Sequence, residues 1–254
     1  DAFEIVAANE ILPNMAKAYS LNHPNVKMYN EDIKNFSAKK IKNDLNIDPS
    51  EIDIIVGGPP CQAYSTVGKR LINDPRGKLF QEYYRVLKEF NPRLFLFENV
   101  KGLISMQNGE LLKNIISLFE SLGYKVKYKI LNAADFGAPQ IRERVIIIGS
   151  KLENDFIYPE QTHIDINKLN TLFNENLKPW LTLEEAISDL PFIRSGEKSN
   201  KYKEKPQNKF QDLMRKNAPL ELNEQVAPKN NDNMIKLMEL LPDGGTPEDL
   251  PENL

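Results

Sequence analysis

Short apolar runs alternate with amphipathic segments along the first 150 residues of the chain. The runs typical of buried strands lie at residues 3–9, 26–29, 52–56, 94–97, 124–131 and 145–149. Helical spacing of apolar residues between them predicts helices over residues 13–21, 79–90 and 110–122, and a short helix capped by Ser37. Strands alternating with helices of this length predict an α/β fold built on a parallel, doubly wound, Rossmann-like sheet.

The pattern changes beyond about residue 151, where prolines and amides become frequent. The only elements predicted there are helices, at residues 182–190 and 233–241. Thr182 and Glu185 have the spacing of a capping box at the start of the first one. We therefore expect a compact α/β domain over residues 1–150 and a mostly irregular and helical region over residues 151–254.

Composition narrows the class of protein. An apolar fraction of 41% is enough for a core, and no apolar stretch approaches the ~20 residues that span a bilayer. The first residues lack the basic region and cleavage site of a signal peptide, and a single cysteine suits a reducing compartment. We therefore expect a cytoplasmic protein with no membrane partner. Because the chain starts inside a strand pattern and without methionine, we also expect that it is a fragment.

The net charge of −3 does not by itself indicate binding to nucleic acid. Basic residues nevertheless cluster between residues 198 and 216, with few acidic residues among them. A solvated face and a phosphate-contacting surface explain this cluster equally well, so the charge pattern leaves both interpretations open.

Cys61, the only cysteine, directly follows the Gly-Gly-Pro-Pro turn after the run at residues 52–56. That run is too apolar for a half-exposed edge, so we expect an interior strand. The glycines let the backbone bend and the prolines stiffen it, which would hold the thiol rigidly at the tip of a strand. Such a thiol could be a nucleophile or an inert side chain. With no second cysteine and only two histidines, we expect no metal site.

Acidic side chains follow three other predicted strands. Glu10, Asp32 and Glu98 stand, like Cys61, at the carboxyl edge of the sheet, where open α/β sheets bind ligands. Glu10 could bind ribose hydroxyls and Asp32 an adenine amino group, although either could simply favour a helix start. Glu98 follows an apolar run, so we expect a buried carboxyl that can donate a proton.

Several segments carry a family resemblance. Gly-Gly-Pro-Pro-Cys-Gln at residues 57–62, Glu-Asn-Val at 98–100 and Gln-Ile-Arg-Glu-Arg at 140–144 resemble three signatures of the DNA (cytosine-5) methyltransferases, in order and spacing. Residues 74–80 and 132–137 are similar to family segments that lie between them. The resemblance covers about residues 3 to 150 and is strongest to the bacterial restriction-modification type. It implies an S-adenosylmethionine-dependent methyltransferase sheet in a bacterial, cytoplasmic protein.

The resemblance implies transfer of a methyl group from S-adenosylmethionine to C5 of a flipped-out cytosine in double-stranded DNA. Cys61 matches the nucleophile that bonds to C6, Glu98 the acid that faces N3, and Arg144 the group that holds O2. Arg142 matches the neighbouring arginine of this catalytic set, which we expect on phosphate or on the protein framework.

The resemblance also implies a cofactor pocket and DNA contacts. The cofactor-binding candidates are Glu10, Ile11, Asp32, Ile33, Pro59, Pro60 and Leu79. The candidates for contact with substrate DNA are Gln62, Ser65, Asn99 and Gln140. The polar loop at residues 63–76 resembles the family's mobile loop that closes over DNA.

The sequence departs from the family pattern at both ends. It lacks the glycine turn that wraps the methionine part of the cofactor, and it lacks the target-recognition region, to which residues 151–254 would be the linker. We expect no turnover from this chain alone, and a second polypeptide could supply the missing segments. The alternatives are a tRNA cytosine-5 methyltransferase and a non-catalytic subunit that binds a partner chain. A cysteine hydrolase is disfavoured, because neither His23 nor His163 is placed near Cys61.

Overall fold

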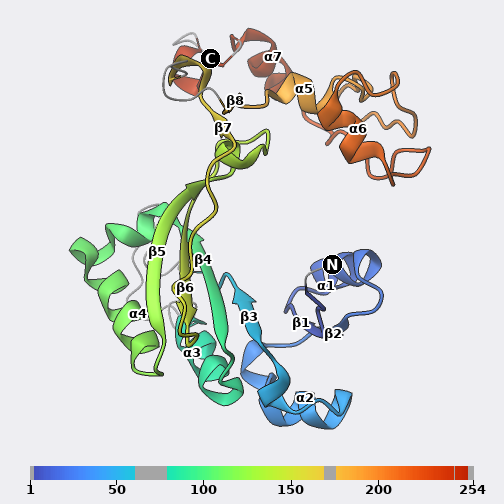
Figure 1. Ribbon diagram of the computed structural model, residues 1–254. Helices are drawn as coiled ribbons and strands as arrows, with labels where there is room; N and C mark the ends of the chain where they lie inside the picture. The colour runs from blue at the N-terminus through green and yellow to red at the C-terminus, as the bar shows by residue number, and fades with distance from the viewer. Residues whose placement is uncertain (1–2, 61–78, 169–175, 243, 251–254) are drawn as a thin grey trace. The chain divides into compact units, whose positions relative to one another are not determined.

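A computed structural model describes residues 3–60, 79–168, 176–242 and 244–250 of the chain (Figure 1). Contacts divide the chain into two compact units. The first comprises Asp1–Ala133 and Ile141–Gln161, and the second comprises Ala134–Gln140 and Thr162–Leu254.

The strands of the first unit follow the predicted apolar runs, with ends shifted by a few residues. Two short ones pair in parallel, β1 (Ala7–Asn9) and β2 (Lys27–Tyr29). The others form a four-stranded sheet in the order β3-β4-β6-β5, comprising β3 (Ile54–Gly57), β4 (Leu94–Val100), β5 (Lys125–Asn132) and β6 (Glu143–Ser150).

The prediction of a wholly parallel sheet is wrong at β6. β3 and β4 run parallel, whereas β6 runs antiparallel to both of its neighbours, β4 and β5. The cause is the connection over residues 133–142, which holds a 3₁₀ turn at Ala133–Phe136. A parallel neighbour needs a crossover of about a dozen residues or more, usually helical, whereas this connection simply returns the chain. The result is an α/β fold with a mixed sheet.

The expectation that residues 52–56 form an interior strand is also wrong. Within the described residues, β3 pairs with β4 alone and forms an edge of the four-stranded sheet. The side chain of Val56 is accordingly 65% exposed. Apolar character marked the strand correctly but did not report how many neighbours it has.

The helices of the first unit confirm the predicted amphipathic segments. They are α1 (Pro13–Asn22), α2 (Ala38–Leu45), α3 (Leu79–Phe90) and α4 (Glu110–Glu120). The Ser37 side chain caps α2 by accepting from Lys40 N, as expected. α3 and α4 pack on the same face of the sheet (Figure 1), around the fully buried Phe95 and Phe97 of β4. This apolar cluster, to which Tyr83 and Phe119 add edge-to-face rings, fixes β4 and therefore the residues at its carboxyl end.

Gly149 of β6 leaves the space that the Phe95 ring occupies in this core. A Cβ atom at this position would lie 1.9 Å from Cε1 of Phe95, whose ring is fully buried. We expect Gly149→Ala to lower the free energy of unfolding of the first unit by about 3 kcal/mol, because the ring cannot move aside without a cost. Urea denaturation followed by circular dichroism measures this. Gly102→Ala is the control, since its Cβ would come no closer than 3.9 Å to Met106.

The second unit is built from short elements. A strand pair, β7 (His163–Ile164) with β8 (Lys178–Pro179), leads to three helices, α5 (Leu183–Ile187), α6 (Lys209–Arg215) and α7 (Asp232–Leu240). The predicted capping box of Thr182 and Glu185 is confirmed at α5. α6 and the strand pair were not predicted, because these segments are too short and too polar to show a period in the sequence. None of the described helices is both long and apolar enough to cross a membrane.

Candidate active site

Glu98 and Arg144 meet at the carboxyl end of β4. The register places Val100 of β4 opposite Arg144 of β6, so Arg144 reaches back along the strand to Glu98. Arg144 Nε lies 2.8 Å from Glu98 Oε1, and Arg144 Nη1 donates to the Glu143 carbonyl at 2.8 Å. Glu98 is not the buried carboxyl that its apolar neighbours suggested, since its side chain is 36% exposed and Arg144's is 24% exposed. The pair therefore presents a carboxylate and a guanidinium to an accessible edge.

The glycine-proline turn after β3 runs directly beside Glu98. A Cβ atom on Gly58 would lie 2.8 Å from Glu98 Oε2, so a side chain there would displace the carboxylate from this position. The next residue of the turn is fixed by Asn99, whose Nδ2 donates to the Pro59 carbonyl at 3.0 Å. The turn continues through the exposed Pro60 towards Cys61, which lies outside the described residues, as do Gln62 and Ser65.

Asn99 is occupied by its own framework. It is 4% exposed, and while Nδ2 binds Pro59, its Oδ1 accepts from Val100 N at 3.0 Å. The prediction of a DNA contact by Asn99 stays a prediction. The observed bonds instead assign it the task of joining the turn that leads to Cys61 to the strand that carries Glu98.

The remaining candidates make fewer side-chain bonds. Arg142 has an exposed side chain, and its backbone pairs with Asn132 Oδ1 and the Ala133 amide. Gln140 is exposed and belongs to the second unit. Leu79 is the partly buried first residue of α3. Their predicted roles stay predictions.

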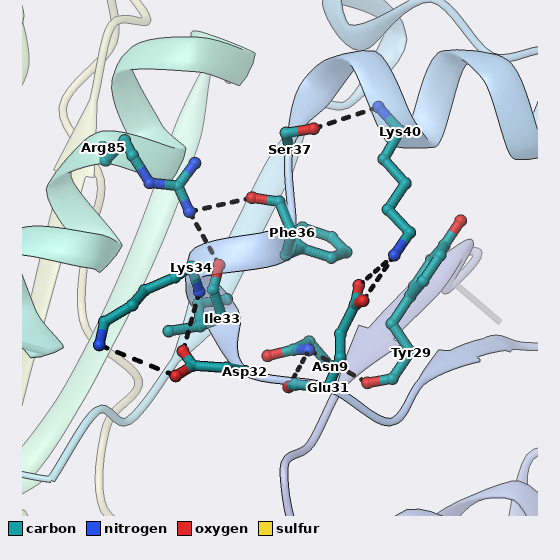
Figure 2. Close-up of polar contacts among 10 residues, drawn as sticks. All are labelled: Asn9, Tyr29, Glu31, Asp32, Ile33, Lys34, Phe36, Ser37, Lys40 and Arg85. Atoms are coloured by element: carbon teal, nitrogen blue, oxygen red, sulfur yellow. Dashed lines mark hydrogen bonds and ion pairs between the residues drawn. The ribbon is translucent and has the colours of Figure 1, made fainter.

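Two asparagines, neither of them predicted as a site residue, organise the carboxyl ends of β1 and β2. Asn9 Nδ2 donates to the Tyr29 and Glu31 carbonyls, each at 3.0 Å (Figure 2). Asn30 Nδ2 donates in return to the Glu10 carbonyl at 2.8 Å and to the Ile11 carbonyl at 3.1 Å. Their only sequence signal was an amide at the end of each strand. Together they tie the two predicted cofactor-binding segments into one edge.

The cofactor candidates at this edge fit a nucleoside. Glu10 uses Oε1 to accept from Leu12 N at 2.9 Å, and Asp32 uses Oδ1 to accept from Lys34 N at 3.0 Å. These two bonds leave Glu10 Oε2 and Asp32 Oδ2 unused, although Lys34 Nζ lies 3.8 Å from Asp32 Oδ2. Ile11, 59% exposed, adds an apolar side chain. Carboxylate acceptors beside exposed apolar surface suit the hydroxyls, amino group and flat face of adenosine.

An ion pair between Lys40 and Glu31 lies just after the carboxyl end of β2. Lys40 Nζ lies 2.6 Å from both carboxylate oxygens of Glu31 and 5.2 Å from the ring centroid of Tyr29. Burial, followed by the nearby Asp44 carboxylate, raises the pKa of Tyr29 to about 12. Tyr29, the buried last residue of β2, is therefore a neutral phenol at physiological pH.

Comparison with known proteins places this geometry in a family. The sequence pattern of the family described as C-5 cytosine-specific DNA methylase matches residues 1–240. The type II methyltransferase M.AquIA of Picosynechococcus sp. is 40% identical over 200 residues, which cover 74% of this chain and 81% of the relative. The type II methyltransferase M.AgeI of Thalassovita gelatinovora is 34% identical, with 85% of this chain and 53% of the relative covered.

The fold agrees with these sequence matches. A solved structure described as a DNA modification methyltransferase encoded within a prophage of E. coli aligns with a TM-score of 0.63 at 26% identity. The alignment covers 83% of this chain and 57% of that one, so the chain spans about half the length of this relative and of M.AgeI. The ordered motifs, the Glu98–Arg144 pair and the matched residues lead to one conclusion: the chain belongs to the C-5 cytosine-specific DNA methyltransferase family.

Proposed function

We propose that this chain carries the catalytic half of a restriction-modification methyltransferase, which transfers a methyl group from S-adenosylmethionine to C5 of cytosine in double-stranded DNA. The observation that carries the proposal is the contact of the glycine-proline turn with Glu98, next to Arg144. This contact brings the segment that leads to Cys61 to the same sheet edge as the acid and the arginine.

The chemistry requires all three groups. C5 of cytosine is a poor nucleophile, so the Cys61 thiolate adds to C6 and pushes an electron pair towards C5 and N3. Glu98 faces N3 and supports its protonation, while Arg144 binds O2 and offsets the developing negative charge. Once C5 has gained the methyl group, loss of the C5 proton and elimination of the sulfur break the S–C6 bond and restore Cys61. The target base must leave the duplex for the thiolate to reach it.

S-adenosylmethionine would supply the electrophilic methyl group when bound. We propose that Glu10 accepts from its ribose hydroxyls and Asp32 from its adenine amino group, with Ile11 and Ile33 against the ring. Pro59, Pro60 and Leu79 complete the proposed pocket. The proposed DNA contacts are Arg142, Gln140, Gln62 and Ser65. We also propose that a second polypeptide could supply missing segments and that the protein is cytoplasmic.

Covalent trapping on DNA that contains 5-fluorocytosine tests this function. The fluorine cannot leave as a proton does, so the S–C6 bond should persist and yield a protein–DNA adduct that survives denaturing electrophoresis. We expect the full natural protein, with any partner chain, to trap in the presence of cofactor, and Cys61→Ala to lose trapping completely. Equal adduct yields from both proteins would show that the thiol is not the nucleophile.

A matched nucleic acid decides the substrate class. The same assay with tRNA that contains 5-fluorocytosine should yield no adduct. If the tRNA traps and the duplex DNA does not, the proposed DNA substrate is wrong, while the proposed nucleophile stands.

A further inference from the structure

Arg85 lies on α3, but its guanidinium serves the segment that follows β2. Its Nη2 donates to the Ile33 carbonyl at 2.8 Å and to the Phe36 carbonyl at 2.9 Å (Figure 2). These carbonyls belong to the first residue of the 3₁₀ turn Ile33–Asn35 and to the residue that follows the turn, and Asp32 caps its start. One side chain therefore holds both ends of the turn that begins at a proposed adenine-binding residue.

Two carboxylates fix the guanidinium from its own helix. Arg85 Nε lies 2.8 Å from Glu82 Oε2, and Arg85 Nη1 lies 2.6 Å from Glu89 Oε1. Burial alone would lower the pKa of Arg85, but its hydrogen bonds to Glu82 and Glu89 raise the pKa above the ordinary value. Glu89 Oε2 also accepts, at 3.1 Å, from the backbone N of Ala38, the first residue of α2. Arg85 thus connects α3 to the turn, and Glu89 connects α3 to the start of α2.

The peptide unit between Ile33 and Lys34 is the point of leverage. Arg85 binds its carbonyl, and the Asp32 carboxylate accepts from its N–H at 3.0 Å. Because a peptide unit is planar, fixing the carbonyl also fixes the direction of the N–H on the opposite side. The orientation of the Asp32 carboxylate therefore depends on Arg85, although no hydrogen bond joins the two side chains within the part of the chain that the structure describes.

Apolar packing docks the segment independently of Arg85. Phe36 stacks on Phe90 of α3 with ring centroids 5.9 Å apart, next to the buried Ile41 and Val86. Because this apolar packing already holds the segment against α3, the donation of Arg85 to two carbonyls mainly sets the orientation of the turn.

We propose that Arg85 is a positioning residue for cofactor binding, which sets the Asp32 turn so that its carboxylate meets the adenine amino group. This inference rests on the proposed function, because it needs the Asp32 edge to be the adenine site. It is distinct from that function, because any nucleoside site at this edge could exist without help from α3.

Calorimetric titration with S-adenosylhomocysteine, and with its analogue dimethylated at the adenine amino group, tests the inference on the full natural protein. The analogue cannot donate a hydrogen bond to Asp32. We expect Arg85→Gln to lower the affinity for S-adenosylhomocysteine about tenfold, which corresponds to the loss of one oriented hydrogen bond. The affinity for the analogue should fall less than about twofold. Arg85→Lys keeps the charge without the fork and should fall between. Arg93→Gln, which removes an exposed arginine paired with Asp53, is the control and should change neither affinity.

Hydrogen exchange adds a readout that does not depend on ligand. The Lys34 and Asn35 amides, which bind Asp32 Oδ1 and the Asp32 carbonyl, should exchange about tenfold faster in Arg85→Gln, while α4 keeps its protection. If the wild type does not bind S-adenosylhomocysteine, both the proposed function and this inference fail. If the wild type binds and Arg85→Gln weakens both ligands equally, or neither, the inference alone is overturned.

Discussion

Replacing Glu98 with glutamine in the full natural protein is expected to lower kcat for the proposed methylation of DNA by about a thousandfold, within the range for loss of a general acid. Glutamine keeps the size of the side chain beside Gly58 but cannot protonate N3, and it removes the negative partner that lies 2.8 Å from Arg144 Nε. Because the proposed interaction of Glu98 with N3 would strengthen as the thiolate adds, kcat should fall far more than KM for either substrate rises. Steady-state transfer of tritiated methyl groups to DNA measures both constants.

The neighbouring carboxylate on β6 provides a matched control. Glu143 pairs with Lys101 Nζ at 2.8 Å and is 43% exposed, so Glu143→Gln makes the same chemical change to a similar ion pair at the same end of the sheet. We expect its kcat to stay within about twofold of wild type, as for most exposed pairs. A Glu98→Gln enzyme as active as this control would remove Glu98 from the mechanism. Unchanged S-adenosylhomocysteine binding in both variants would show that the cofactor edge is intact.

The sequence predicted those parts of the fold that depend on local pattern. α3 runs from Leu79 to Phe90, as the apolar stripe indicated, because a long amphipathic period has few alternative structures. Strand direction is not encoded in an apolar run, so the antiparallel β6 was missed, although the short connection at residues 133–142 carried the signal. The edge position of β3 was missed for a related reason, since burial depends on neighbours that a local pattern does not contain.

The site shows the same division. Glu98 and Arg144 were chosen from the family motifs, and the structure brings them together across 46 positions of sequence by pairing β4 with β6. The supporting residues were not predicted as such. Asn9, Asn30 and Arg85 act through carbonyls that are distant in the sequence, and a lone amide or arginine in a sequence does not show which carbonyl it will meet.

The stability of the second unit depends on a buried ion pair between Asp189 and Arg215. Asp189, fully buried, accepts from Arg215 Nε and Nη2, both at 2.8 Å, and its own carbonyl accepts from Lys203 N at 2.9 Å. Asp189→Ala would leave the guanidinium, 22% exposed, without this partner. Breaking one side of such a pair costs about 3–5 kcal/mol, and the partial exposure of Arg215 favours the lower figure. We therefore expect the free energy of unfolding of this unit to fall by about 3 kcal/mol.

The chain offers a direct probe for this effect, because Trp180 is its only tryptophan and lies in the second unit. Its Nε1 donates to Asp135 Oδ1 at 2.9 Å within the same unit, so its fluorescence follows the unfolding of that unit in urea. Asp212→Ala removes an exposed carboxylate from α6 and should shift the midpoint little. If Asp189→Ala also leaves the midpoint unchanged, the pair contributes specificity without stability. Because α5 and α6 are each too short to be stable alone, the ion pair between Asp189 and Arg215 should add to the stability of this unit.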